Sequence, residues 1–446
     1  MEHELTKGPV MKTMLLFAVP MILGDLLQQC YNIADTLIVG RFLGADALAA
    51  VGASASITFL FVAIATGLSI GSSVVISQYF GAKRYGEMKT AIQTVLLASF
   101  VIALCLMLVG IFGTDAILRF MQTPQKIFSD ASLYLKIYFC GLVFLFLYNM
   151  LTASFNAIGD SKSPLVFLAL SSVCNIVLDL YFVTERKMGV AGAALATDIS
   201  QAISVVVSFL WLCTRMKKMK TQQKSRIFDL HILEIVCNVA VPSMLQQSMV
   251  SIGIFLVQRL VNGYGEAVMA GYAAATKIDS IAILPMVNVG NAVSTFTAQN
   301  IGGKKPERVK EGFRAGLLMS AVIGVIVTGI LLVYAKVFVG LFMDSSSNQA
   351  AIATGIEYLR VVGLFYALMG IMNTCTGVLR GAGDILWFLM VTLINLSSRV
   401  ILAYSMSGML GAKAIWWSIP IGWGIGFAIG FVRYLSGKWQ KSSLIE

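Results

Sequence analysis

The sequence predicts an all-α membrane protein of twelve transmembrane helices, arranged as two six-helix lobes that are related by an internal repeat. The first observation is composition. The 446 residues are 58% hydrophobic and only 12% charged, and the mean hydropathy of +0.83 is too high for a soluble protein. The second is a series of apolar segments of roughly 20 residues or more, enough to cross about 30 Å of hydrocarbon. The third is a set of motifs that occurs twice in the same order.

Twelve segments are long and apolar enough to span a bilayer. We expect the long segments at the start of each half to be bent or tilted. The expected spans are 13–40, 46–76, 90–113, 128–155, 163–183, 190–213, 231–261, 267–298, 311–338, 350–377, 385–407 and 411–435.

The repeat relates the two halves of the chain over most of their length. In an apolar chain, two homologous halves are typical of a transporter whose substrate path runs between them. The matched pairs include Pro20 and Pro242, Gly44 and Gly265, Gln78 and Gln299, Gly81 and Gly302, and Asp160 and Asp384.

The repeat and one polar segment predict the domain organisation. Residues 1–213 form an N-lobe with helices 1 to 6, and residues 231–446 form a C-lobe with helices 7 to 12 and a short tail. Between them, residues 214–230 are rich in Lys, Gln and Ser and are expected to be a cytoplasmic linker.

Charge predicts the orientation. An even number of spans places both termini on one side, and most of the 33 Lys and Arg residues fall on that side, so both termini are expected to be cytoplasmic. The first apolar segment has no cleavage site and continues as a spanning helix. We therefore expect a multi-pass protein of a bacterial inner (plasma) membrane. The net charge of +11 is explained by orientation and anionic lipid headgroups, without a nucleic-acid partner.

Metal, cofactor and enzyme chemistry are not expected. All seven cysteines lie in or beside apolar spans, their number is odd, and their spacing with His3 and His231 matches no metal site. The sequence contains no zinc-ligand set, no Ser/His pairing and no selectivity-filter loop. We therefore predict a protein that is neither an enzyme nor a channel, with no catalytic residues, no metal and no cofactor. Its partners would be small molecules and the bilayer, and it would act as a monomer.

Acidic residues inside the N-lobe spans are the main functional signal. An ionisable side chain in a bilayer costs at least ~2.5 to 3.5 kcal/mol, so such residues often mark ion or substrate paths. Gln28, Asn32 and Asp35 share one helical face, and so do Asn175 and Asp179.

The expected depth of these residues in the membrane matches that of a polar residue on a third helix. At about 1.5 Å per residue, Asp35, Asp179 and Thr197 lie roughly 6 to 10 Å inside the outer ends of their helices. Their oxygens suit a hard cation or a protonated acid. Asp198 points about 100° away from Thr197 along the helix, so a structural role for it stays open. The predicted ion or proton coupling residues are Asp35, Asn175, Asp179, Thr197 and Asp198.

The C-lobe does not repeat these acids. The repeat places Arg399 opposite Asn175 and Ala403 opposite Asp179. We expect Arg399 to join ion pairs of structural origin, together with the pairs Lys277/Asp279 and Glu357/Arg360. Polar residues that could line a substrate cleft, or merely join helices, are Gln28, Asn32, Gln246, Gln247 and Asn288. Pro20 is expected to permit a bend in helix 1.

These motifs resemble those of the multidrug and toxic compound extrusion (MATE) transporters. The resemblance covers nearly the whole chain and implies twelve helices around a V-shaped central cleft, with outward transport of organic cations driven by Na⁺ or H⁺. Asp35, Asn175, Asp179 and Thr197 match the acidic N-lobe site of one branch. Another branch has a Glu in helix 7, where this chain has Gln246-Gln247, so no C-lobe Na⁺ site is expected. The motifs are Pro20…Asp35…Gly40-Arg41…Gly44, Gln78-x-x-Gly81, Asn175-x-x-x-Asp179, Gly192-Ala193-Ala194-x-Ala196-Thr197 and Arg380-Gly381-x-Gly383-Asp384.

The sequence thus predicts a cation-coupled (H⁺ or Na⁺) multidrug efflux antiporter that exports cationic or amphiphilic compounds by alternating access. The alternative is a lipid-linked precursor flippase of the same superfamily. Such a flippase is expected to have a strongly basic central cavity and often extra helices, whereas this N-lobe is acidic and the predicted spans number twelve. The coupling ion stays open, because Na⁺ and H⁺ use the same oxygen ligands.

Overall fold

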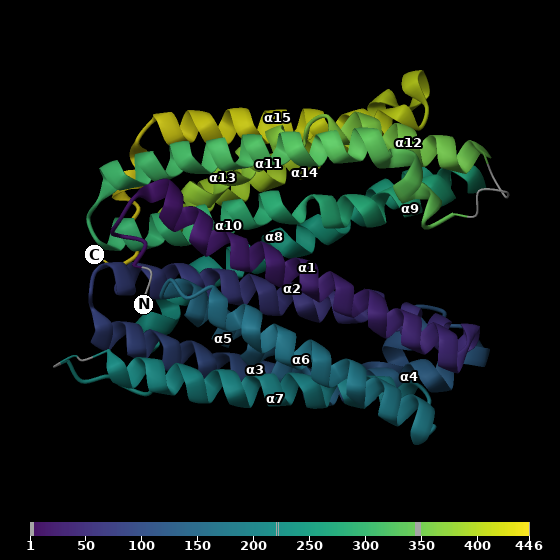
Figure 1. The fold of residues 1–446 in the computed structure, drawn as a ribbon, viewed down its shortest axis with the longest axis horizontal. Coiled ribbons are helices and arrows are strands. Elements are labelled where there is room, and N and C mark those ends of the chain that lie inside the picture. Colours follow the sequence, from purple (N-terminus) through teal and green to yellow (C-terminus); the bar gives the residue numbers. More distant parts are fainter. Residues whose placement is uncertain (1–3, 220, 222, 344–348, 446) are drawn as a thin grey trace. The chain divides into compact units, whose positions relative to one another are not determined.

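The computed structural model describes residues 4–219, 221, 223–343 and 349–445, and its fold is all-α (Figure 1). Among the described residues, ten helical stretches are long and apolar enough to cross a membrane, and two of them join neighbouring elements, α6 with η1 and α9 with α10. Two further pairs pass the same test together, α4 with α5 and α12 with α13, although each pair is bent, by 46° and 49°. If each bent pair counts as one span, the total is twelve, in agreement with the sequence prediction.

The helices fall into two compact units. The N-terminal unit consists mainly of Leu23–Met244, and the C-terminal unit consists of His3–Ile22 together with Leu245–Glu446. The helices of the first half are α1 (Val10–Leu43), α2 (Ala45–Gly81), α3 (Tyr85–Phe120), α4 (Gln125–Cys140), α5 (Leu142–Ala157), α6 (Lys162–Leu180), the π-helix η1 (Tyr181–Glu185) and α7 (Val190–Lys218). Those of the second half are α8 (Leu230–Asn262), α9 (Glu266–Ala282), α10 (Leu284–Gly302), α11 (Pro306–Gly340), α12 (Gln349–Gly363), α13 (Tyr366–Ala382), α14 (Ile385–Leu410), α15 (Lys413–Leu435) and the short η2 (Lys438–Lys441).

The compact units differ from the two sequence repeats at α1 and α8. The first part of α1 belongs to the C-terminal unit, and the first part of α8 belongs to the N-terminal unit. Each of these helices contains a proline, Pro20 or Pro242, just before the position where the units divide. Proline removes a backbone hydrogen bond and weakens the helix at that point. Each helix therefore passes from one compact unit to the other close to its weakest point.

Glycines explain how the first part of α8 packs in the N-terminal unit. A Cβ added to Gly71 of α2 would lie 2.5 Å from the Cα of Ala240, and one added to Gly67 would lie 2.6 Å from the Cα of Met244. Small residues allow helix backbones to approach closely in membranes. The close packing of α2 against α8 therefore depends on these two glycines.

The segment before α1 contacts the rest of the C-terminal unit through backbone hydrogen bonds and apolar packing. Leu5 is fully buried in a hydrophobic core that includes Phe17, Phe296 and Trp439. Its N–H donates to Oε1 of Gln299 at 3.1 Å, and its carbonyl accepts from Asn300 Nδ2 at 3.3 Å. These contacts explain why the segment that precedes α1 stays with the second half of the sequence.

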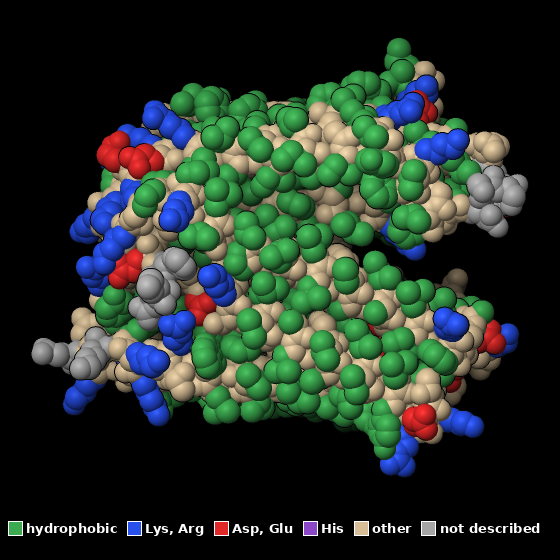
Figure 2. Space-filling model, viewed as in Figure 1, with side chains coloured by type: hydrophobic (Ala, Val, Ile, Leu, Met, Phe, Trp, Pro, Cys, Tyr) green, Lys and Arg blue, Asp and Glu red, His purple; other side chains and the backbone are tan. Residues whose placement is uncertain are grey.

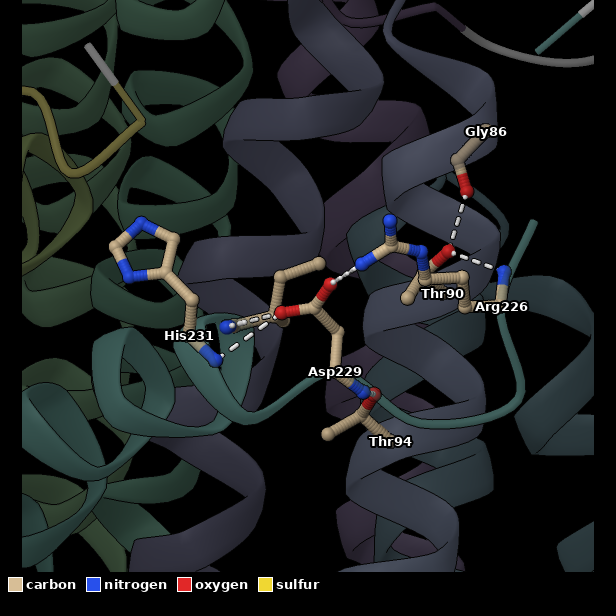
Figure 3. A network of polar contacts seen from close by, with 7 residues as sticks. Gly86, Thr90, Thr94, Arg226, Asp229 and His231 are labelled. Carbon is tan, nitrogen blue, oxygen red and sulfur yellow. Dashed lines mark hydrogen bonds and ion pairs between the residues drawn. The ribbon is translucent and has the colours of Figure 1, made fainter. Parts of the chain in front are cut away.

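The segment between α7 and α8 is hydrogen-bonded to α3 (Figure 3). The Arg226 and Asp229 N–H groups donate to the hydroxyls of Thr90 and Thr94, at 3.0 and 3.1 Å. The Asp229 carboxylate then accepts from the first backbone N–H groups of α8, including that of His231 at 3.1 Å. It caps the helix, which explains why α8 begins at Leu230.

The surface of each unit has the pattern of a membrane protein. Hydrophobic side chains cover the sides of the helices, and Lys, Arg, Asp and Glu gather at the helix ends (Figure 2). Large apolar side chains such as Phe112, Val325 and Leu386 are more than half exposed, which only a lipid environment tolerates at this frequency. The protein is therefore a multi-pass membrane protein.

Candidate functional site

All five predicted coupling residues come from three helices of the N-terminal unit, and Asp198 follows Thr197 on α7. Asp35 lies on the second part of α1, Asn175 and Asp179 lie one turn apart on α6, and Thr197 lies on α7. Helix α6 changes to the π-helix η1 two residues after Asp179. Single π-turns occur often at functional sites, because they shift the side-chain positions around them.

Asp35 and Asp179 are brought side by side. Their carboxyl groups lie within hydrogen-bonding distance of each other. Asp179 is fully buried, and neither of its oxygens has a donor among the described residues; the same holds for Oδ1 of Asp35. Ionised carboxylates are acceptors only, so a proton or a cation bound at this pair would supply the interaction that its oxygens lack.

Asn175 and Thr197 complete the polar group. The Asn175 amide donates from Nδ2 to the Thr197 hydroxyl at 3.3 Å, and that hydroxyl donates to the carbonyl of Ala193 at 3.1 Å. Oδ1 of Asn175 is buried with no donor in the described part of the chain. The site thus contains at least four buried acceptor oxygens with no described donor: Asp35 Oδ1, both oxygens of Asp179 and Asn175 Oδ1.

Three tyrosines of the same unit surround the acids, and sequence reasoning missed them. The Tyr31 hydroxyl lies within electrostatic range of Asp35 and Asp179. Tyr134 lies within the same range of Asp35, and Tyr138 within that of Asp198. A signal was present, because Tyr31 is four residues before Asp35, and Tyr134 and Tyr138 have the same spacing.

Asp198 has a different environment from the Asp35 pair. It is 9% exposed and packs against Gly141, which separates α4 from α5; a Cβ on Gly141 would overlap the Asp198 carboxylate. It is also within electrostatic range of Tyr31 and Tyr138. Asp198 therefore lies beside the bend between α4 and α5, near Tyr31, which is also within electrostatic range of Asp35 and Asp179.

The residues predicted to line a substrate cleft divide between the units. Gln28 donates to Oδ1 of Asn32 at 3.4 Å on α1, as their helical spacing predicts. Gln246 and Gln247 are partly buried on the second part of α8, and the amide of the buried Asn288 donates to the carbonyl of Leu284 at 3.1 Å. A shared cleft for these residues stays a prediction. Pro20 is buried within α1, which continues through it as one helix.

Two ion pairs expected in the C-terminal unit are wrong. Asp279 of α9 contacts tyrosines rather than Lys277: its Oδ1 accepts from Tyr366 at 2.6 Å and its Oδ2 from Tyr358 at 3.4 Å. Glu357 of α12 pairs with Lys413 at 2.9 Å rather than with Arg360. Both expectations rested on closeness in sequence, whereas the helix contacts place residues from other helices opposite these acids.

The described residues contain no group of three or more His, Cys, Asp and Glu side chains that could hold a metal ion. All seven cysteines are free, and only Cys375 is fully buried. The oxygen-rich group around Asp35 and Asp179 is therefore the candidate site of this unit, with chemistry suited to a proton or an alkali cation.

Comparisons with known proteins agree with this architecture. A family model described as MatE matches residues 20–181 and 242–405. The "Probable multidrug resistance protein YpnP" of Bacillus subtilis is 30% identical, over 99% of this chain and 98% of that protein. The "Multidrug export protein MepA" of Staphylococcus saprophyticus is 25% identical, over 93% and 91% of the two chains.

Solved structures show the same fold. A structure described as the outward-facing conformation of a multidrug resistance MATE family transporter of the MOP superfamily is similar with a TM-score of 0.90 and 25% identity, over 99% of both chains. A MOP superfamily transporter from Pyrococcus furiosus, whose description reports a binding pocket of reverse polarity, is similar with a TM-score of 0.89 and 25% identity, over 100% of this chain and 99% of that one. The chain therefore belongs to the MatE family, the multidrug and toxic compound extrusion transporters, which are not enzymes.

Proposed function

We propose that the protein is a multidrug efflux antiporter of a bacterial plasma membrane, and that it exports cationic or amphiphilic compounds in exchange for inward-moving H⁺ or Na⁺. One observation carries the coupling assignment: Asp35 and Asp179 meet in the N-terminal unit without a donor for three of their oxygens. The names of the relatives support drug export.

The exchange follows from competition for one negative charge. When the Asp35 and Asp179 pair is ionised, it attracts either a cationic drug or the coupling ion. Uptake of the coupling ion lowers the negative charge of the pair and weakens the electrostatic attraction for the drug. Because Asp35 lies on the same helix as Pro20, a change in its contacts with α6 can be transmitted to the weakened point of α1, as alternating access requires.

The coupling site lies within one unit of one chain, so a monomer is sufficient for the proposed exchange. Both termini are placed on the cytoplasmic side, because the side that carries them also carries most of the Lys and Arg residues. The coupling ion is the only small partner besides the drug, and no cofactor is proposed.

Efflux of a fluorescent cationic dye such as ethidium from energised cells tests the proposal, at set Na⁺ and pH gradients. We expect Asp35→Asn and Asp179→Asn each to reduce the efflux rate by at least tenfold, because an amide keeps the shape but cannot exchange a proton or carry the charge. Asp46→Asn is the matched control. Asp46 is an exposed acid of the same unit, which pairs with Lys126 at the surface.

Dependence of the wild-type rate on only one of the two gradients would identify the coupling ion. Unchanged efflux in both variants would refute the assigned site. Absence of dye movement in the wild type, together with accumulation of lipid-linked precursors on depletion of the protein, would favour the flippase.

A further inference from the structure

A second polar site of opposite charge lies in the C-terminal unit, on Arg399. The residue is in α14 (Ile385–Leu410), roughly 15 to 20 Å from either helix end at 1.5 Å per residue. A charged residue at this depth is costly, and it is retained where it has a partner or a function. The repeat places Arg399 at the position that Asn175 occupies in the N-terminal unit.

The packing around Arg399 leaves space for its side chain. A Cβ on Gly422 of α15 would overlap Cγ of Arg399 and would lie 3.1 Å from its Cδ. The same Cβ would lie 2.8 Å from Oδ1 of Asn395, which is one turn before Arg399. Gly422 therefore allows the aliphatic part of Arg399 to lie against α15.

One buried acid of the same unit lies within electrostatic range of this guanidinium but does not pair directly with it. Asp279 is within electrostatic range of Arg399, but its two oxygens already accept from the hydroxyls of Tyr366 and Tyr358. Within the described ranges, the Arg399 guanidinium has no hydrogen bond and no ion pair within 4.0 Å. Arg399 is also only partly buried.

The surroundings of Arg399 are aromatic. Tyr272 stacks on Trp416 at 5.9 Å between ring centroids, and Tyr358 meets the Trp416 ring edge-on at 5.4 Å. Arg399 lies within electrostatic range of both tyrosines. Trp416 is 1% exposed, and its indole N–H has no acceptor among the described residues. Two donor groups in one cluster therefore lack acceptors, and charge interactions are strong in such surroundings.

We propose that Arg399 is the residue that binds the carboxylate of aromatic substrates. A guanidinium binds a carboxylate through two parallel hydrogen bonds. Asp279 balances the charge of Arg399 when no substrate is bound. The inference rests on the proposed drug export and names the residue that recognises the carboxyl group of a substrate.

Equilibrium binding of two related dyes tests the inference. Rhodamine 110 carries a free carboxylate, and rhodamine 123 is its methyl ester, so the pair differs only in the group that Arg399 would bind. Binding of each dye to the purified full-length protein is measured by fluorescence anisotropy in detergent, without any ion gradient. We expect Arg399→Gln to weaken the binding of rhodamine 110 by about tenfold and to change the binding of rhodamine 123 by less than about twofold. Equal effects on both dyes, or no binding of rhodamine 110 to the wild type, would overturn the inference.

Two further variants separate binding from folding. If Arg399 served only to balance Asp279, the double variant Asp279→Asn/Arg399→Gln would melt like the wild type and would bind rhodamine 110 normally. We expect it to melt like the wild type but to remain defective for rhodamine 110. Arg399→Lys, which keeps the charge without the planar fork, should be intermediate between wild type and Arg399→Gln. Because dye binding requires no gradient, these results do not depend on whether Asp35 couples transport to an ion.

Discussion

At the scale of single residues, the central feature is a buried carboxyl pair whose hydrogen bonds are incomplete. Asp179 is fully enclosed and its oxygens lack donors in the described structure. Buried polar groups in stable structures are nearly always paired, and an unpaired group costs about 1 to 3 kcal/mol. An ion or proton that binds here would supply the missing interaction, and this explains why the arrangement fits coupling better than a structural clamp.

The tyrosine hydroxyl beside this pair gives a prediction for affinity. Tyr31→Phe removes a hydroxyl that lies within electrostatic range of Asp35 and Asp179 while the ring remains, so we expect the coupling ion to bind roughly fivefold more weakly, equivalent to about 1 kcal/mol. The concentration of Na⁺ or H⁺ that gives half-maximal dye efflux measures this change. Tyr181→Phe is the control, because Tyr181 is an exposed residue of η1 in the same unit and its hydroxyl accepts from Arg186 at 2.8 Å. An equal shift in both variants would contradict a specific role for Tyr31.

At the scale of elements, α1 and α8 are unusual because each contributes to both compact units. Sequence periodicity predicted both helices, and Pro20 was expected to permit a bend. Their division between units was not predictable from the repeat, because it depends on which neighbours each half of the helix packs against. Gly67 and Gly71 for α8, and the contacts of Leu5 and Phe17 for α1, supply those neighbours.

The close packing of α8 on α2 predicts a difference between two glycines of one helix. In Gly71→Ala the new Cβ would lie 2.5 Å from the Cα of Ala240, and such overpacking costs about 1 to 3 kcal/mol. Gly52 of the same helix has open space around its Cβ position, so Gly52→Ala should be neutral or slightly stabilising. Thermal unfolding in detergent compares the two variants. A melting temperature for Gly71→Ala as high as that of Gly52→Ala would argue against tight packing of α2 and α8.

The capping residue of α8 provides a second prediction at this scale. Asp229→Ala removes the acceptor for the first N–H groups of the helix and should cost about 1 kcal/mol. Hydrogen exchange should accelerate in the first turn of α8, from Leu230 onward. Glu234→Ala removes an exposed acid from the next turn and should leave exchange in the first turn unchanged. Identical exchange in the two variants would show that the network of Figure 3 does not hold this helix end.

At the scale of the whole molecule, the fold has the character that composition demands. Apolar side chains face outward along the helices, and charged side chains collect at the helix ends (Figure 2). The membrane interior stabilises the exposed apolar side chains, and water stabilises the charged ones. The orientation of that fold in the membrane follows from the distribution of Lys and Arg, and it can be measured directly.

Topology is tested with single cysteines in a background without the seven native ones. We expect Lys126→Cys, at the start of α4, to react with a membrane-impermeant maleimide in intact cells. Lys438→Cys, beyond α15, should react only after permeabilisation, because both termini are expected to be cytoplasmic. The reverse labelling pattern would show that the protein is inserted in the opposite orientation.

The sequence by itself determined the class, the spans and the repeat, because these depend on hydrophobic length and on local pattern. It also identified Asp35, Asn175, Asp179 and Thr197, since burying polar groups in an apolar helix is costly enough to make each one conspicuous. Only the tertiary structure decided that Asp35 and Asp179 touch, that Asp279 is held by tyrosines, and that Arg399 is left without a direct partner. Those facts depend on which faces of distant helices meet, and helix packing sets them through side-chain shape rather than through any local sequence signal.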